Sequence, residues 1–426
     1  MSNRKRLISN FLSLSSVQVA NYVFPLITVP YLVRVLGPEK FGLLAFAQAF
    51  IGYFGLVTDY GFGLSATRSV SIHRDNKERV DEIFSSVVLI KAALMILSFL
   101  VMCIVVFSIP RFRAEWLVYI FTFGVVLGGV LFPSWLFQGL EKMKQIAIFN
   151  MFSRAFFTIC IFIFIRSQND YPYVPLITAI GSLFVGIIAL LIVLFKLEVK
   201  FRWPESSEIK YQLREGWHIF ISTIAISLYT ISNTFILGIF AGTTVVGYFS
   251  AGEKIVKAVQ GLMGPLSQTV YPHISKLANE SRDVAMAFMK RLVRIIGLPM
   301  FVLSFSLCIF AAPLSNLILG EQFKESIPVI RILSFLPFII GMATIYSNFF
   351  LLAFGFTRAW SRIIISSSVA SLIGALIFVY LLGMGHVGIS INILLTEIIV
   401  LVSSFVYYRK YAIMPSLKCA IKGSAE

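Results

Sequence analysis

The chain has 426 residues, of which 58% are hydrophobic and only 13% charged, and its formal net charge is +16 at pH 7. Water-soluble domains carry about 25% charged residues, so this composition excludes an ordinary soluble globular protein. Apolar runs of roughly 20 residues, the length that spans a bilayer as a helix, recur along the whole chain. We therefore expect an all-α polytopic membrane protein.

Twelve apolar segments are long enough to cross a membrane. The first follows a basic N-terminus but lacks the short core and cleavage site of a signal peptide, so it is expected to be an uncleaved helix. The predicted spans are residues 10–35, 41–61, 83–109, 117–139, 146–165, 175–195, 218–240, 244–272, 295–318, 327–354, 363–382 and 388–408. The longer connections, around 62–82 and 196–217, are expected to be short amphipathic links rather than domains.

Basic residues are distributed unequally between alternate connections. One set, which includes the two termini and ends with Lys418 and Lys422, holds 25 Lys and Arg residues, whereas the other set holds five. Those five are Lys40, Arg111, Arg113, Arg166 and Lys324. Because cytoplasmic connections are rich in Lys and Arg, we predict cytoplasmic N- and C-termini. The net charge is then a topology signal, and no nucleic-acid partner is expected.

Two turns suggest an internal repeat. The turn LGPEKFGLLAFAQ after the first span and the turn FAGTTVVGYFSAGE after the seventh contain Gly37 and Gly42, and Gly242 and Gly247, at an offset of 205 residues. A second echo pairs Gly139 of WLFQGLEKMK with Gly355 of LLAFGFTRAW, at an offset of 216 residues. We predict two six-helix bundles, residues 1–205 and 206–426, related by a parallel pseudo-two-fold repeat with its axis along the membrane normal.

The stretch FSAGEKIVKAVQGLMG, residues 249–264, carries charges into the eighth predicted span. On a helix Glu253, Lys254, Lys257 and Gln260 fall within a sector of about 120°. A charge at the bilayer centre costs about 2.5–3.5 kcal/mol even on insertion scales, so this stripe is expected to face a cavity. The same offset places Gln48 and Asp59 on the equivalent face of the second span. These six positions form the first part of the predicted substrate-binding set.

Other polar residues also lie at membrane depth. Among all the charged residues there, those of the stripe included, six are basic and three are acidic. They predict a cationic central cavity that suits an anionic substrate. The further candidates are Arg34, Lys91, Asn233 and Arg331, with Arg154, Asn348, Asn392 and Glu397 at similar depth. Two independent structural alternatives stay open. In one, Arg34 and Arg154 reach the interface from helix ends; in the other, Lys91 and Glu397 form an ion pair.

No pattern for catalysis or metal binding is present in the sequence. The four cysteines and four histidines are scattered, and no phosphate-binding glycine loop occurs. We therefore expect no catalytic residue, no metal and no cofactor. The carboxylates of Asp59, Glu253 and Glu397 leave coupling to a H⁺ or Na⁺ gradient open.

The segments VPYLVRVLGPEKFGLLAFAQAFIGYFGLVTDYGF and VGYFSAGEKIVKAVQGLMGPLSQTVYP, together with WLFQGLEKMK, resemble bacterial polysaccharide flippases of the O-antigen (Wzx) type. That family belongs to the multidrug/oligosaccharidyl-lipid/polysaccharide exporter superfamily, and the resemblance covers essentially the whole chain. It implies alternating-access transport of an undecaprenyl-pyrophosphate-linked oligosaccharide from the inner to the outer leaflet of the bacterial inner membrane. A polysaccharide polymerase and a chain-length regulator are the implied protein partners. Lys254 and Lys257 are expected to hold the pyrophosphate, with Glu253 paired to Lys257 when no cargo is bound.

Three alternatives to an O-antigen flippase are considered. An exporter of other lipid-linked precursors and a multidrug exporter belong to the same superfamily, although cationic drugs would favour an acidic cavity. A membrane-embedded polysaccharide polymerase would need acidic catalytic residues and a sizeable outer loop, whereas the predicted outer loops are short. We therefore expect a transporter and not an enzyme.

Overall fold

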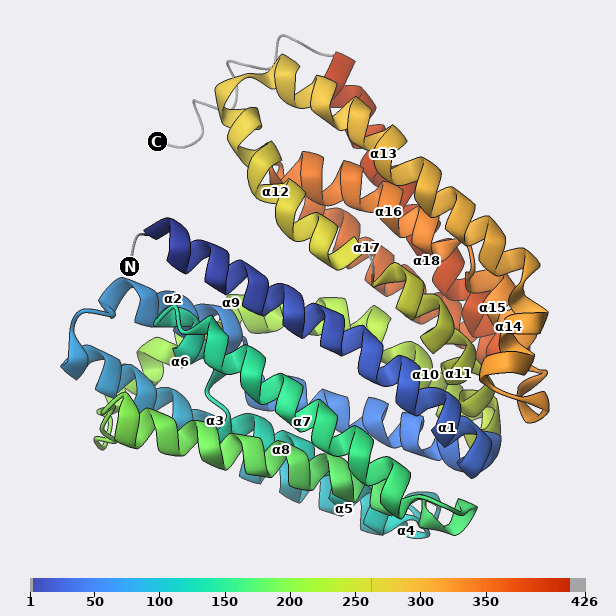
Figure 1. Ribbon diagram of the computed structural model, residues 1–426, viewed down its shortest axis with the longest axis horizontal. Helices are drawn as coiled ribbons and strands as arrows, with labels where there is room; N and C mark the ends of the chain where they lie inside the picture. The colour runs from blue at the N-terminus through green and yellow to red at the C-terminus, as the bar shows by residue number, and fades with distance from the viewer. Residues whose placement is uncertain (1–2, 262, 414–426) are drawn as a thin grey trace. The chain divides into compact units, whose positions relative to one another are not determined.

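The computed structural model describes residues 3–261 and 263–413, and within them the chain is helical and contains no β-strand (Figure 1). Lys418 and Lys422 of the predicted cytoplasmic set lie outside the described residues. By compactness the chain divides into two units, Met1–Gly247 and Tyr248–Glu426. The predicted division into six-helix bundles of residues 1–205 and 206–426 has a different boundary from these units, and it stays a prediction.

The first unit is a bundle of long apolar helices with short helices in the links. Its elements are α1 (Asn3–Asp59), α2 (Phe62–His73), α3 (Lys77–Ser108), α4 (Pro110–Arg113), α5 (Trp116–Leu131), α6 (Ser134–Gly139), α7 (Met143–Phe164), η1 (Gln168–Asp170), α8 (Tyr173–Leu191), η2 (Ile192–Lys196), α9 (Ser206–Thr230) and α10 (Ser232–Ala241). Helix α5 packs along α8, and α1 contacts α3, α5 and α7 (Figure 1). Helices α9 and α10 contact α1, so the chain of the seventh predicted span packs within this unit.

The second unit begins within α11 and is also entirely helical in its described part. Its elements are α11 (Thr243–Gln260), α12 (Met263–Glu280), α13 (Arg282–Ile309), α14 (Ala311–Ile318), η3 (Glu321–Phe323), α15 (Ser326–Leu333), α16 (Leu336–Tyr346), η4 (Ser347–Leu352), α17 (Thr357–Ala375), η5 (Leu376–Leu381) and α18 (Gly385–Ile413). Helix α16 packs against α13 and α18, and α17 packs against α18. Apolar side chains that include Met300 of α13 and Phe349 and Phe350 of η4 form a buried core.

All twelve predicted spans coincide with helical segments. The break predicted between the first two spans is a non-helical Gly37 inside α1. The predicted span 244–272 is divided instead, because α11 ends at Gln260 and α12 begins at Met263. Among the described residues, eight helical segments are long and apolar enough to cross a membrane. The all-helical multi-pass fold is thus confirmed, whereas the count of twelve stays a prediction.

In the first unit, polar contacts connect the segments that lie at one end of the helix bundle. Beyond the C-terminal end of α3, Lys40 Nζ lies 3.0 Å from Glu115 Oε1, and the hydroxyl of Tyr171 donates to the other carboxylate oxygen of Glu115. Arg111 donates to the backbone carbonyls of Gly238 and Ile239, which satisfies acceptors in the last turn of α10. Links predicted to lie on one side of the membrane therefore meet at one end of this bundle.

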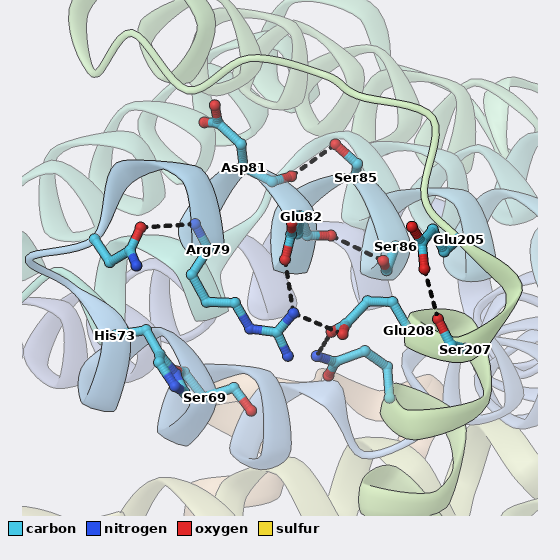
Figure 2. Close-up of polar contacts among 12 residues, drawn as sticks. Ser69, His73, Arg79, Asp81, Glu82, Ser85, Ser86, Glu205, Ser207 and Glu208 are labelled. Carbon is cyan, nitrogen blue, oxygen red and sulfur yellow. Dashed lines mark hydrogen bonds and ion pairs between the residues drawn. The ribbon is translucent and has the colours of Figure 1, made fainter.

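The N-terminal end of α3 carries a second polar network. Figure 2 shows the Arg79 guanidinium between Glu82 and Glu208, at 2.7 Å from each carboxylate. The Nε2 of Gln212 donates to Glu208 at 2.8 Å, and the backbone N–H of Lys200 donates to the buried Asp81 at 2.9 Å. These bonds tie the link 197–205 and the start of α9 to α3. The predicted amphipathic link is therefore held in place by α3.

The two turns with the 205-residue offset adopt the same backbone conformation. Gly37 has φ 67° and ψ 175°, and Gly242 has φ 92° and ψ 167°, a region that is essentially restricted to glycine. By contrast, Gly355 has a positive φ and open space around it, whereas Gly139 is packed against Val70, so the second echo has no common local structure. The shared conformation agrees with the predicted repeat at the first pair of turns only.

These turns also pack against each other reciprocally. A Cβ atom on Gly42 would lie 1.8 Å from the carbonyl oxygen of Thr243, and one on Gly247 would lie 2.0 Å from the carbonyl oxygen of Pro38. Pro38 and Thr243 are themselves 205 residues apart. The glycine of each turn therefore packs against the equivalent residue of the other turn. Only glycine permits this approach, since real Cβ atoms do not come so close to backbone.

We predict that Gly42→Ala destabilises the first unit by about 1–3 kcal/mol, the usual cost of overpacking, because the added methyl must push the two turns apart. The measurement is the thermal unfolding midpoint of the purified protein. Gly129→Ala in α5 is the matched control, since a Cβ there meets nothing within 4 Å and alanine favours a helix. An unchanged midpoint for Gly42→Ala would show that the turns are not in close contact.

Candidate functional site

The charged stripe of α11 is the first predicted part of the site. Lys257 Nζ lies 2.8 Å from Glu253 Oε1, so the predicted pair between these residues is present. The Glu253 side chain is 18% exposed and that of Lys257 56%. The other side of α11 is closely packed, because a Cβ on Gly252 would lie 3.0 Å from Val329 of α15. The charges thus lie on the less buried side of this helix, with Lys254 and Gln260 partly buried beside them.

The first unit contains a pocket of about 360 Å³ between α1, α3, α5 and α8. Its size falls within the range of small-ligand sites. The polar residues of its lining are Gln48, Thr58, Asp59, Lys91, Thr122 and Thr178. Gly52, Gly55 and Gly129 keep the walls open, because they place no side chain there. The pocket brings together three sequence-predicted site residues, Gln48, Asp59 and Lys91.

An ion pair between α1 and α3 sets the charge of this pocket. Lys91 Nζ lies 3.0 Å from Asp59 Oδ1, and the Lys91 side chain is only 7% exposed, whereas Asp59 is 50% exposed. Lys91 therefore has a carboxylate partner within the first unit, and the alternative pair with Glu397, a residue of the second unit, stays a prediction. Packing of α3 against α1 places the ammonium beside the last residue of α1, which sequence spacing alone does not indicate. Lysine at this depth is tolerated because it has a carboxylate partner.

The remaining candidates are not gathered in this pocket. Arg34 of α1 is exposed and Asn233 of α10 is buried, and neither belongs to its described lining. Arg331, near the end of α15, is exposed. Throughout residues 3–261 and 263–413, no group of three or more His, Cys, Asp or Glu side chains is placed to hold a metal.

The three threonines of the pocket were not predicted from the sequence. Thr58 lies one residue before Asp59, but Thr122 and Thr178 lie within apolar runs, where a single hydroxyl usually bonds its own helix. Thr122 and Thr178 become pocket residues because α5, which contacts α1, also packs along α8. The one signal available was the concentration of glycine around them, at Gly124, Gly128 and Gly129.

We predict that Asp59→Asn lowers stability by about 1–3 kcal/mol, because it leaves the buried ammonium of Lys91 without its counter-charge. Glu253→Gln is the matched control and should cost at most about 1 kcal/mol, because the Lys257 side chain is more than half exposed. Thermal unfolding midpoints of the two purified variants make the comparison. Equal midpoints would contradict the structural role of the Asp59–Lys91 pair.

Comparison with known proteins assigns this chain to a family. A family model described as "Polysaccharide biosynthesis protein" matches residues 7–278. A protein named "Putative O-antigen transporter" from Escherichia coli (strain K12) is 33% identical over 94% of this chain and 96% of its own length. A protein of the same name from Shigella dysenteriae is 31% identical over 92% of this chain and 97% of its own length.

Solved structures share the fold at low sequence identity. An inward-facing multidrug resistance MATE family transporter of the MOP superfamily superposes with a TM-score of 0.74 at 14% identity, covering 95% of this chain and 96% of its own. The lipid II flippase MurJ in an inward closed conformation gives a TM-score of 0.72 at 17% identity, covering 92% and 87%. From the family match and the relatives along nearly its whole length, the chain belongs to the polysaccharide biosynthesis protein family.

Proposed function

We propose that this protein is a flippase that moves a lipid-linked oligosaccharide, an O-antigen or related repeat unit, from the inner to the outer leaflet of the bacterial inner membrane. The observation that carries the proposal is a polar pocket with a membrane-depth ion pair, in a chain whose relatives are named O-antigen transporters. The fold shared with a lipid II flippase supports the same class of cargo. Such a protein is a transporter and performs no bond chemistry of its own.

The cargo that fits best is an undecaprenyl-pyrophosphate-linked oligosaccharide. Its lipid tail stays in the bilayer while the diphosphate and sugars need a polar route across it. We propose that this route is a cationic central cavity that works by alternating access, because basic residues outnumber acidic ones at membrane depth. The contact between the turns that contain Gly42 and Gly247 would then close the route in one of the alternating states. H⁺ or Na⁺ coupling through Glu397 or another carboxylate belongs to the same proposal.

Lys254 and Lys257 are proposed to bind the pyrophosphate. Lysine provides a mobile point charge that suits phosphate, and the ammonium of Lys257 has the exposure needed to leave Glu253 for a stronger anion. Among rival functions, export of other lipid-linked precursors uses the same chemistry. A multidrug exporter for cations is disfavoured by the basic excess. A polysaccharide polymerase and a chain-length regulator are proposed as partners rather than as activities of this chain.

We predict that Lys254→Ala/Lys257→Ala loses most export, whereas Lys257→Arg keeps much of it, because phosphate needs positive charge more than one donor geometry. The measurement is the amount of repeat unit that reaches the outer leaflet in cells deleted for the gene and carrying each variant. Membrane levels of each variant provide the control for folding. Wild-type export by a stably inserted double alanine variant would show that these lysines are not the pyrophosphate site.

We also predict that the end of the first unit with Lys40 faces the periplasm. Single cysteines at Lys40 and Lys324 should react with an impermeant thiol reagent in intact spheroplasts, because both belong to the sparsely basic connections. A single cysteine at Lys210, in the strongly basic set, should react only after the membrane is opened. The reverse pattern would invert the predicted orientation of the termini.

A further inference from the structure

The lining of the pocket in the first unit has no net charge, which restricts the kind of ligand that fits it. Asp59 and Lys91 neutralise each other, and no other charged residue belongs to its described lining. An anion therefore meets no excess of positive charge here. A cation meets a carboxylate that already has an ammonium at 3.0 Å. The balance favours a neutral ligand.

The hydrogen-bonding groups of the pocket are mainly acceptors. The hydroxyls of Thr58, Thr122 and Thr178 donate to the backbone carbonyls of Phe54, Val118 and Val174, at 2.8, 2.6 and 2.9 Å. Because each hydroxyl has a single proton, only oxygen lone pairs remain to face the pocket. The half-exposed carboxylate of Asp59 adds further acceptor sites. A matching ligand must therefore bring several O–H donors.

A few donors and an apolar wall complete the lining. Gln48 is exposed and carries an amide, and Lys91 retains N–H groups beyond the one directed at Asp59. Ile51, Val125, Val126 and Val130 form the apolar part. A sugar ring has this combination, with hydroxyls that both donate and accept at its rim and C–H groups on its faces. A pyrophosphate offers acceptors only, which the threonine oxygens and Asp59 would repel.

We infer that the pocket between α1, α3, α5 and α8 is a subsite for a neutral sugar ring, held through its hydroxyl groups by Asp59, Gln48 and the three threonines. The inference rests on the proposed function, because it assigns the sugar part of the cargo to the first unit. It separates Gln48, Asp59 and Lys91 from the pyrophosphate contacts that are proposed for Lys254 and Lys257. Lys91 acts as a positioning residue that holds the Asp59 carboxylate in place.

Protection of a cysteine in the pocket tests this assignment. Val125→Cys is introduced into full-length protein whose native cysteines are replaced by Ser, because Val125 lines the pocket and is 38% exposed. The probe is the oligosaccharide repeat released by mild acid from the lipid-linked intermediates of the cells that make this protein. Saturating oligosaccharide should slow N-ethylmaleimide labelling of this cysteine at least about fivefold. Inorganic pyrophosphate should not slow it, and a control cysteine at the exposed Ser108 should respond to neither probe.

A hydroxyl deletion adds a second readout. Thr122→Val keeps the shape of the side chain but removes one acceptor, so the oligosaccharide concentration for half protection should rise by about fivefold, the effect of one lost hydrogen bond. Thr223→Val is the matched control, since Thr223 also donates to the carbonyl four residues earlier but lies outside the described lining. An equal shift for both variants would overturn the assignment of Thr122 to a sugar site.

The remaining outcomes separate the subsite from the proposed function. Protection by pyrophosphate equal to that by oligosaccharide would make the pocket an anion site and overturn the inference. Absence of protection by either probe, in protein that moves the lipid-linked repeat unit in proteoliposomes, would overturn the subsite alone. Protection by oligosaccharide in protein that moves no lipid-linked repeat unit would support the sugar site and overturn the flippase.

Discussion

The cost of an unpaired charge in hydrocarbon is the constraint on which this structure depends. A chain of long apolar helices keeps lysine at membrane depth only where a carboxylate or a polar cavity receives it. Lys91 meets that condition through Asp59, and Lys257 through Glu253. The two pairs differ in consequence. Lys91 is buried at the wall of a pocket in the first unit, beside Asp59, whereas the Lys257 side chain is exposed, as the phosphate contact proposed for it requires.

Close backbone packing between two turns is a second constraint on this structure. Gly37 and Gly242 share one unusual conformation, and Gly42 and Gly247 each receive the opposite turn at a distance that no side chain tolerates. A contact made of glycine and backbone has no interdigitating side chains to withdraw when it opens. Such a contact would suit a closure that forms and separates repeatedly, as the alternating access proposed above requires.

Sequence reasoning predicted the helical fold, the break at Gly37 and the Glu253–Lys257 pair, because these depend on local spacing along one helix. It did not predict that Lys91 pairs with Asp59, because that contact depends on how α3 packs against α1. Thr122 and Thr178 were missed for the same reason. The second echo, at Gly139 and Gly355, shows the limit of motif matching, since equal residues there have different surroundings. Helix-to-helix packing, rather than periodicity, decides which polar residues share a cavity.

The most direct test of the account is leaflet transfer of a lipid-linked oligosaccharide by the purified full-length protein in proteoliposomes. Repeat units that reach the outer leaflet are counted by a membrane-impermeant sugar-cleaving enzyme. We expect transfer well above that of protein-free vesicles, and we expect Lys254→Ala/Lys257→Ala to lose it. Transfer at the protein-free rate, by protein that is folded and correctly inserted, would contradict it.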